Sequence, residues 1–260
     1  MSSATPPPVL ASLGSAYYHW DFLPSQKTPT GRFRAVYDGP APTMERMEVH
    51  VTELEPGLEC HPPHQHAHEE MMILKEGELE VSLGGRKQRI SPGALVFVAA
   101  LDSHNWKNVG SGPAIYYVIN FFTEASLPSG AGAGGLTAAP GALDSTVVAW
   151  DAIVPIPNGV GGTRRGLLDA MTRTFSLLKV HATTTPPGLP GARHAGHRCL
   201  ELIIIKEGIL EYCIDGVTSR VGPGSLVYLA PEAVHTVRNV GADPATYYVF
   251  AVSSAKTPAA

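Results

Sequence analysis

The chain has 260 residues, of which 44% are hydrophobic and 16% charged, and this balance predicts a folded protein of one large or two small domains. A net charge of −4 without any basic run argues against a nucleic-acid partner, and no apolar run reaches the roughly 20 residues of a membrane helix. The three cysteines, Cys60, Cys199 and Cys213, lack a C-x-x-C spacing, so we expect free thiols. Since residues 1–8 hold neither a basic residue nor an apolar signal segment, we expect a cytoplasmic protein.

Short apolar or alternating segments, bounded by turn residues, follow one another through the first half of the chain. None of them shows the 3.6-residue period of a helix. The 27 glycines and 23 prolines are typical of many short strands joined by tight turns. We therefore predict an all-β fold, with strands in 45–54, 71–76, 79–83, 94–99 and 115–122.

A segment rich in Gly, Ala and Pro, residues 128–141, separates the two halves of the chain. Its composition is typical of a flexible linker, and it is the natural domain boundary. We expect an N-terminal domain over residues 1–127 and a C-terminal domain over residues 142–260.

The second half repeats the first, which indicates an internal duplication. Trp20 matches Trp150 at a shift of 130, so one residue has been gained before the later landmarks, which match at a shift of 131. These later pairs are His50 with His181, Gly77 with Gly208, Pro92-Gly93 with Pro223-Gly224, His104 with His235 and Asn108 with Asn239. The chain is therefore expected to consist of two fused copies of one unit.

Side chains that bind metals gather between the predicted strands of the first copy. His64 and His66 lie two residues apart, so on a strand both would point to the same face. Glu70 follows in the same stretch, and His104 comes from a later strand. Such a mixed nitrogen and oxygen set suits Fe, Mn, Ni, Cu or Zn.

At these residues the sequence resembles the cupin family. The matching residues are Gly57, His64, His66, Glu70, Gly77, Pro92-Gly93, His104 and Asn108. The resemblance implies a small antiparallel jelly-roll barrel, or double-stranded β-helix, with one divalent transition metal in its mouth. It assigns His64, His66, Glu70 and His104 as the metal ligands. Because the repeat carries the same landmarks, the chain resembles a bicupin, with two tandem cupin barrels.

Two further histidines, His61 and His68, enlarge the cluster. Reading the ligand pair as His66 and His68 would place Met72 at the carboxylate position, where it could not bind as the glutamate does. We therefore interpret His61 and His68 as neighbours of the ligands or as solvated side chains.

The second copy departs from the first at one ligand position. His197, Glu201 and His235 match His66, Glu70 and His104, whereas Ala195 stands opposite His64. Two histidines and one carboxylate could still hold iron with open positions, so these three residues form a second candidate metal site. His194 is an alternative ligand, although strand alternation points it to the opposite face. The other interpretation is a copy retained for its structure.

An ion held by three imidazoles and one carboxylate keeps a positive charge and open positions, which favours catalysis over a purely structural role. The leading hypothesis is a metal-dependent dioxygenase-like oxidoreductase acting on a small oxygen-rich organic molecule, as the resemblance to bicupin dioxygenases implies. A non-redox isomerase, decarboxylase or aminohydrolase is the alternative enzyme, and a non-catalytic small-molecule-binding bicupin is the third hypothesis. Both a monomer and a homodimer are compatible with the sequence.

Other residues are candidates for the surroundings of the site. His50, His61, His68 and Glu69 are candidate proton acceptors beyond the ligands. Arg32 and Arg34 are placed either at the barrel mouth or on a solvated surface. An aromatic lining for a flat ligand is predicted from Phe97, Trp106, Tyr116, Phe121 and Phe122, each of which could instead belong to the core.

Overall fold

Every strand predicted in the first half is present, close to its expected bounds. These strands are β4 (Met44–Leu54), β5 (Glu69–Glu76), β6 (Leu79–Leu83), β8 (Leu95–Val98) and β10 (Ala114–Phe122). Four more polar or mixed strands of this half join them in the first barrel: β2 (Ser25–Thr28), β3 (Gly31–Ala41), β7 (Arg86–Ile90) and β9 (His104–Asn108). The computed structural model describes residues 13–126, 140–189, 193–194 and 197–257.

The second half forms the corresponding strands in the same order. They are β12 (Ile156–Pro157), β13 (Thr163–Ala170), β14 (Leu177–Thr185), β15 (Arg193–His194), β16 (Leu200–Glu207), β17 (Leu210–Ile214), β18 (Val217–Val221), β19 (Leu226–Leu229), β20 (His235–Asn239) and β21 (Ala245–Ser253). The helices within the described ranges are the single 3-10 turns η1 (Trp20–Phe22), η2 (Glu124–Ser126) and η3 (Trp150–Ala152). None of these described helices has the length or apolar character to span a membrane.

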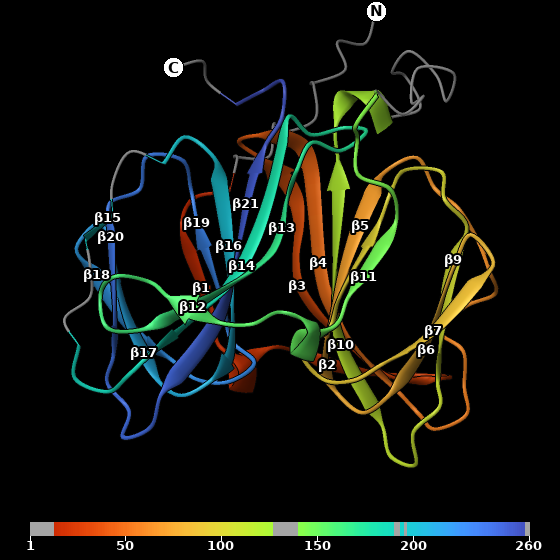
Figure 1. Cartoon of the computed structure of the whole chain (residues 1–260), viewed down its shortest axis with the longest axis horizontal. Helices are drawn as coiled ribbons and strands as arrows, with labels where there is room; N and C mark the ends of the chain where they lie inside the picture. The colour runs from red at the N-terminus through yellow and green to blue at the C-terminus, as the bar shows by residue number, and fades with distance from the viewer. Residues whose placement is uncertain (1–12, 127–139, 190–192, 195–196, 258–260) are drawn as a thin grey trace, which may run out of the picture.

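Each half pairs a large antiparallel sheet with a small one. In the first half the seven-stranded sheet has the order β11-β8-β5-β10-β4-β3-β2 and the small sheet the order β7-β6-β9. In the second half the orders are β1-β19-β16-β21-β14-β13-β12 and β15-β20-β17-β18. A buried apolar cluster fills each unit, and Figure 1 shows the two barrels side by side. The predicted all-β architecture of two tandem barrels is confirmed.

One short strand of each half completes the large sheet of the other half. β1 (Ala16–Tyr18) pairs with β19 of the second barrel, and β11 (Thr146–Val148) pairs with β8 of the first. Figure 1 shows β1, in red, among the blue strands of the second barrel and β11, in green, on the side of the first barrel. The domain limits 1–127 and 142–260 stay a prediction, and all but Pro140 and Gly141 of the expected linker lies outside the described residues.

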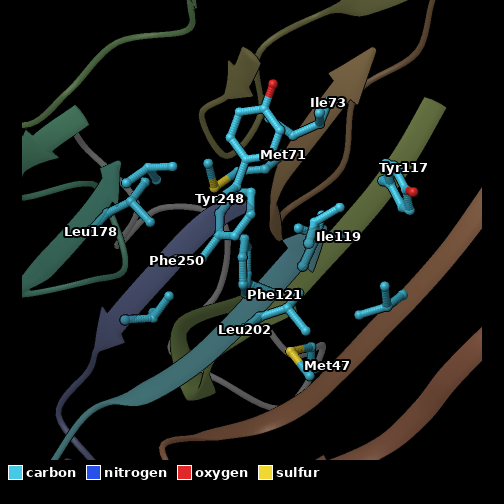
Figure 2. Close-up of a cluster of buried hydrophobic side chains, with 14 of the residues drawn as sticks. Met47, Met71, Ile73, Tyr117, Ile119, Phe121, Leu178, Leu202, Tyr248 and Phe250 are labelled. Carbon is cyan, nitrogen blue, oxygen red and sulfur yellow. The ribbon is translucent and has the colours of Figure 1, made fainter. Parts of the chain in front are cut away.

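The alternation of side chains on the large sheets builds a third core between the barrels. Residues on one face of β4 and β10, such as Val49 and Ile119, are almost fully buried there against residues of β14 and β21, such as Val180 and Phe250. Figure 2 shows aromatic, aliphatic and methionine side chains from both halves interlocked in this cluster. The opposite faces of the same strands are thereby free to line the barrel interiors.

Two tryptophans explain the repeated Pro-Gly dipeptides. A Cβ on Gly224 would lie 2.6 Å from Cδ2 of Trp20, and a Cβ on Gly93 would lie 2.9 Å from Cγ of Trp150. Each glycine therefore accommodates an indole from the opposite half, at a positive φ that also favours glycine. Tyr117 and Tyr248 make the contact reciprocal, because their hydroxyls donate to the carbonyl oxygens of Gly224 and Gly93.

Candidate metal centre

The inner faces of β4 and β10 form one wall of a cavity of about 400 Å³ in the first barrel. β4 contributes His50 and Thr52, while β10 contributes Tyr116, Val118 and Asn120. Strand alternation produces this wall, because the residues between these positions pack into the core between the barrels.

The structure brings together all four predicted ligands of the first barrel at this cavity. His64 and His104 are paired across a backbone bridge, with their ring centroids 4.5 Å apart. The ring of His66 lies 4.8 Å from that of His104, and its Nε2 is 3.1 Å from Oε2 of Glu70. The same carboxylate oxygen lies 3.8 Å from Nε2 of His104. Three imidazoles and one carboxylate therefore converge on one small volume.

Backbone carbonyls set the tautomers of two of these histidines. Nδ1 of His66 lies 2.8 Å from the carbonyl oxygen of His68, and Nδ1 of His104 lies 3.0 Å from that of Asp102. A carbonyl oxygen only accepts, so each Nδ1 carries the proton and donates it. Nε2 of His104 is then a lone pair, buried and without a hydrogen-bond partner in the described part of the chain. An orphaned imidazole nitrogen beside a carboxylate fits a metal ligand.

The charges of the site agree with this fit. Burial, together with the neighbouring His61 and His104, lowers the pKa of His64 to about 4, so its imidazole is neutral at pH 7. Burial alone would raise the pKa of Glu70, but His104 and His66 hold it at about 2. Burial lowers the pKa of His104, and the Glu70 carboxylate outweighs this effect, so that the net shift is upward. His64 and Glu70 therefore offer the neutral and the anionic donor that divalent metals require, and a bound metal would replace the proton that Glu70 favours on His104.

His61 and His68 lie closer to the ligands than the sequence pattern implied. The ligating atoms of His61, His64 and His104 lie within 4.8 Å of one another, and so do those of His66, His68 and Glu70. The ring of His68 stacks on that of His66 at 3.6 Å. Together these groups could hold a metal ion, with His61 and His68 as immediate neighbours of the four ligands.

The predicted aromatic lining is correct in part. Trp106 and Tyr116 line the cavity, whereas Phe97 and Phe121 lie in the core between the barrels. Phe122 packs against the ring of His68 instead of lining the cavity wall. Of the two arginines, Arg32 lines the cavity, while Arg34 lies over the ring of Trp20.

A second polar pair lies on β4, where His50 lines the cavity and Glu48 is its hydrogen-bond partner. Nδ1 of His50 donates to Oε1 of Glu48 at 2.7 Å, and Nδ2 of Asn120 donates to Oε2 of the same carboxylate at 2.6 Å. Sequence reasoning named His50 as a proton acceptor but missed Glu48. The available signal was their spacing of two residues, which places both on one face of a strand.

The second barrel holds a cavity of about 370 Å³ with its own histidine cluster. The ligating atoms of His194, His197 and His235 lie within 4.8 Å of one another, and Oε2 of Glu201 is 3.9 Å from Nε2 of His235. The expectation that His194 points away is therefore wrong. His194 pairs with His235 on β15 and β20, as His64 pairs with His104, so His194 occupies the position that alignment gave to Ala195. Ala195 itself lies outside the described residues.

A polar network connects the candidate metal centre of the first barrel to the second half of the chain. Glu69, beside Glu70 on β5, is fully buried and accepts hydrogen bonds from the hydroxyls of Thr172 and Thr174 at 2.6 and 2.7 Å. Arg173 forms an ion pair of 2.9 Å with Asp102, whose carbonyl oxygen fixes His104. Glu69 is thus a structural anchor between the halves, and the role of proton acceptor does not fit it.

The model of the Cupin_2 family, described as a cupin domain, matches residues 50–120 and 182–251, which together make up more than half of the chain. No curated protein matches the chain in sequence. Several solved structures share the fold over nearly the whole chain.

Protein Ylba from E. coli has a TM-score of 0.71 at 12% identity, and the match covers 95% of this chain and 93% of that one. AerE from Microcystis aeruginosa has a TM-score of 0.69 at 13% identity, with coverage of 91% and 98%. A mutant of Bacillus subtilis oxalate decarboxylase has a TM-score of 0.68 at 14% identity, with coverage of 94% and 78%. At these identities the likeness concerns the fold.

Proposed function

The chain is a two-barrel member of the cupin family. We propose that it is a metal-dependent enzyme whose active site is the cavity of the first barrel. The observation that carries this proposal is the convergence of His64, His66, Glu70 and His104, with Nε2 of His104 buried and unpartnered within the described residues. A structural role would require neither an open cavity of about 400 Å³ beside the ligands nor an orphaned nitrogen facing them.

These four residues would hold one divalent transition metal, and Fe, Mn, Ni, Cu and Zn all accept such donors. When bound, the metal would act as a Lewis acid toward an oxygen of the substrate and, if redox-active, would also allow reaction with O₂. The chain's own contribution is to orient the ligands through Asp102 and His68 carbonyls and to enclose a small molecule between Trp106, Tyr116 and the inner face of β4.

For the reaction class, we propose dioxygenase-like oxidation of a small oxygen-rich organic molecule such as an enol, a phenol or a keto acid. Trp106 and Tyr116 offer apolar surface to a flat substrate, and Arg32 offers a cation to an anionic one. The size of the cavity is compatible with a substrate of this class.

Non-redox chemistry, meaning isomerisation, decarboxylation or amine hydrolysis, is the second candidate. It is favoured by His50 at the cavity wall and by its hydrogen bond to Glu48, because such reactions require a base or acid beyond the metal ligands. Oxalate decarboxylase, which shares the fold, is named for a reaction of this type.

The test is elemental analysis of the purified protein beside His66→Ala and His197→Ala, followed by oxygen uptake with enol and catechol substrates. We expect His66→Ala to lose one metal per chain relative to the wild type, because it removes a ligand of the first site. A second metal that is lost in His197→Ala but kept in His66→Ala would extend the proposal to the set formed by His194, His197, Glu201 and His235.

The metal found decides between the candidate reactions. A redox-active metal with substrate-dependent oxygen uptake supports the dioxygenase-like activity, and turnover without oxygen uptake supports the non-redox candidate. A protein that takes up no metal even after reconstitution would contradict both, and would favour a non-catalytic small-molecule-binding protein.

A further inference from the structure

We propose that His50 is the proton acceptor of the first cavity, with Glu48 as the residue that orients it, so that substrates of this site are acids whose hydroxyl or C–H proton must be removed. The inference rests on the proposed function, because it concerns the same cavity. It adds a catalytic residue and a substrate property that the metal ligands by themselves do not define.

The hydrogen bonds of His50 leave its other nitrogen free to accept a proton. Glu48 is a carboxylate that only accepts, so Nδ1 of His50 carries the proton in the 2.7 Å hydrogen bond between them. In the neutral imidazole the lone pair is then on Nε2, on a ring that lines the cavity. The ring packs against that of Phe33, with the two ring centroids 4.8 Å apart. This arrangement of carboxylate and imidazole is the one that general-base histidines use.

The position of the pair relative to the ligands leaves space for a substrate. Asn120 on β10 stands opposite Glu48 on β4 and opposite Glu70 on β5. The backbones of Glu48 and Glu70 are thus two strand spacings apart, which is about 10 Å. His50, two residues further along β4, lines the same cavity as His64 and Glu70, so a small molecule bound beside the ligands would share this cavity with His50.

The second cavity provides the internal comparison. His181 stands where His50 does, but Lys179 replaces Glu48 and Ala251 replaces Asn120 at the paired positions. The ammonium of Lys179 pairs with Asp169 at 2.7 Å, and Nδ1 of His181 has no hydrogen-bond partner among the described residues. The second histidine has lost the carboxylate that would orient it, so the proton acceptor is confined to the first barrel.

The proposed step is a proton transfer that balances by itself. The O–H or C–H bond of the substrate breaks, its electron pair stays on the substrate as an oxyanion or enolate, and an N–H bond forms at Nε2 of His50. Glu48 stabilises the resulting imidazolium by its negative charge. The other ionisable groups that face this space come from β3, β5, β9, β10 and the segment between β4 and β5. They are Arg32, Cys60, His61, His64, His66, His68, Glu70, His104 and Tyr116.

The test counts protons released when 4-nitrocatechol binds to the metal-loaded protein at a pH of about 7.5. Calorimetry in two buffers of different ionisation enthalpy gives this count without relying on turnover. If His50 keeps one of the diol protons, His50→Asn should release about one more proton per chain than the wild type. The asparagine amide can still donate to Glu48, and an unchanged metal content shows that the first site has folded.

Two further variants complete the design. Glu48→Gln should also release more protons than the wild type, because its amide can donate to Nδ1 of His50 and would move the ring proton to Nε2. His181→Asn, the matched change in the second cavity, should give the wild-type count.

The outcomes separate this inference from the proposed function. Equal proton release in the wild type and His50→Asn, or no binding of the diol to a metal-loaded protein, would overturn the inference and leave the metal site intact. A wild type that binds no metal would remove the proposed function and the inference with it.

Discussion

Single hydrogen bonds decide what each histidine of the two cavities can do. A carbonyl oxygen accepts from Nδ1 of His66 and of His104, which leaves Nε2 of each for a metal. A carboxylate accepts from Nδ1 of His50, which prepares that ring for proton transfer. Nδ1 of His181 has neither kind of partner within the described residues. We therefore expect the burial of His181 to affect the stability of the protein and not proton transfer.

His181 should make the protein less stable in acid. Burial, together with the charges of Arg164 and Lys179, lowers the pKa of His181 from 6.5 to about 4. The unfolded chain therefore takes up a proton first, and stability that is complete above pH 6.5 is lost as the pH falls towards 4. We expect the free energy of unfolding to fall by on the order of 2 kcal/mol, a value reduced for the solvent screening of the exposed part of the ring.

Urea unfolding at a pH of about 7 and again at about 4.5 measures this effect. His181→Asn should lose less stability than the wild type between the two values, because asparagine does not titrate. The same loss in both proteins would show that the acid sensitivity comes from other groups.

Among the elements, the turns that precede β8 and β19 matter most for joining the halves. Gly93 and Gly224 give room to Trp150 and Trp20, which follow the exchanged strands β11 and β1. Each tryptophan also has two cationic side chains over its ring. Arg34 and Lys75 of the first half lie over Trp20, and Arg165 and Lys206 of the second half lie over Trp150. These contacts hold the exchanged strands in place.

Gly224→Ala should destabilise the protein by about 2 to 4 kcal/mol, through overpacking against Trp20 and through strain at its positive φ. Denaturant unfolding measures this effect as a lower midpoint concentration, with an unchanged dependence of the free energy of unfolding on denaturant concentration. Gly222→Ala is the matched control, since a Cβ there meets nothing within 4 Å, and it should stay within about 0.5 kcal/mol of the wild type. A midpoint for Gly224→Ala equal to that of the control would mean that Trp20 can move aside.

Much of the element pattern could be predicted from the sequence, because alternation and the repeat both report strands that face a core. The positions of β5, β6 and β10 follow from this signal. The exchanged strands β1 and β11 have three residues each, too few for a periodic signal, and nothing local specifies a partner so distant in sequence. The predicted orientation of His194 is wrong because regular strand alternation does not extend to this position, where β15 has only two residues.

For the whole molecule, the core between the barrels is as well buried as the core inside each one. It draws side chains from both large sheets, and the exchanged strands and the network around Glu69 add polar contacts across the same boundary. The two barrels should therefore unfold together.

Differential scanning calorimetry checks this cooperativity. We expect one transition, with a van't Hoff enthalpy close to the calorimetric enthalpy. Two resolved transitions, or a van't Hoff enthalpy well below the calorimetric one, would show that each barrel is stable without the other.

The reciprocal exchange of β1 and β11 also bears on symmetry. Two separate copies of one half, joined by the same exchange, would form a twofold dimer in which every substitution appears in both cavities. Fusion into one chain removes that constraint while keeping the contact. Glu48 and Lys179 occupy equivalent positions with opposite charge, a difference that no homodimer could carry. The covalent connection therefore permits two unlike cavities within a pseudosymmetric frame.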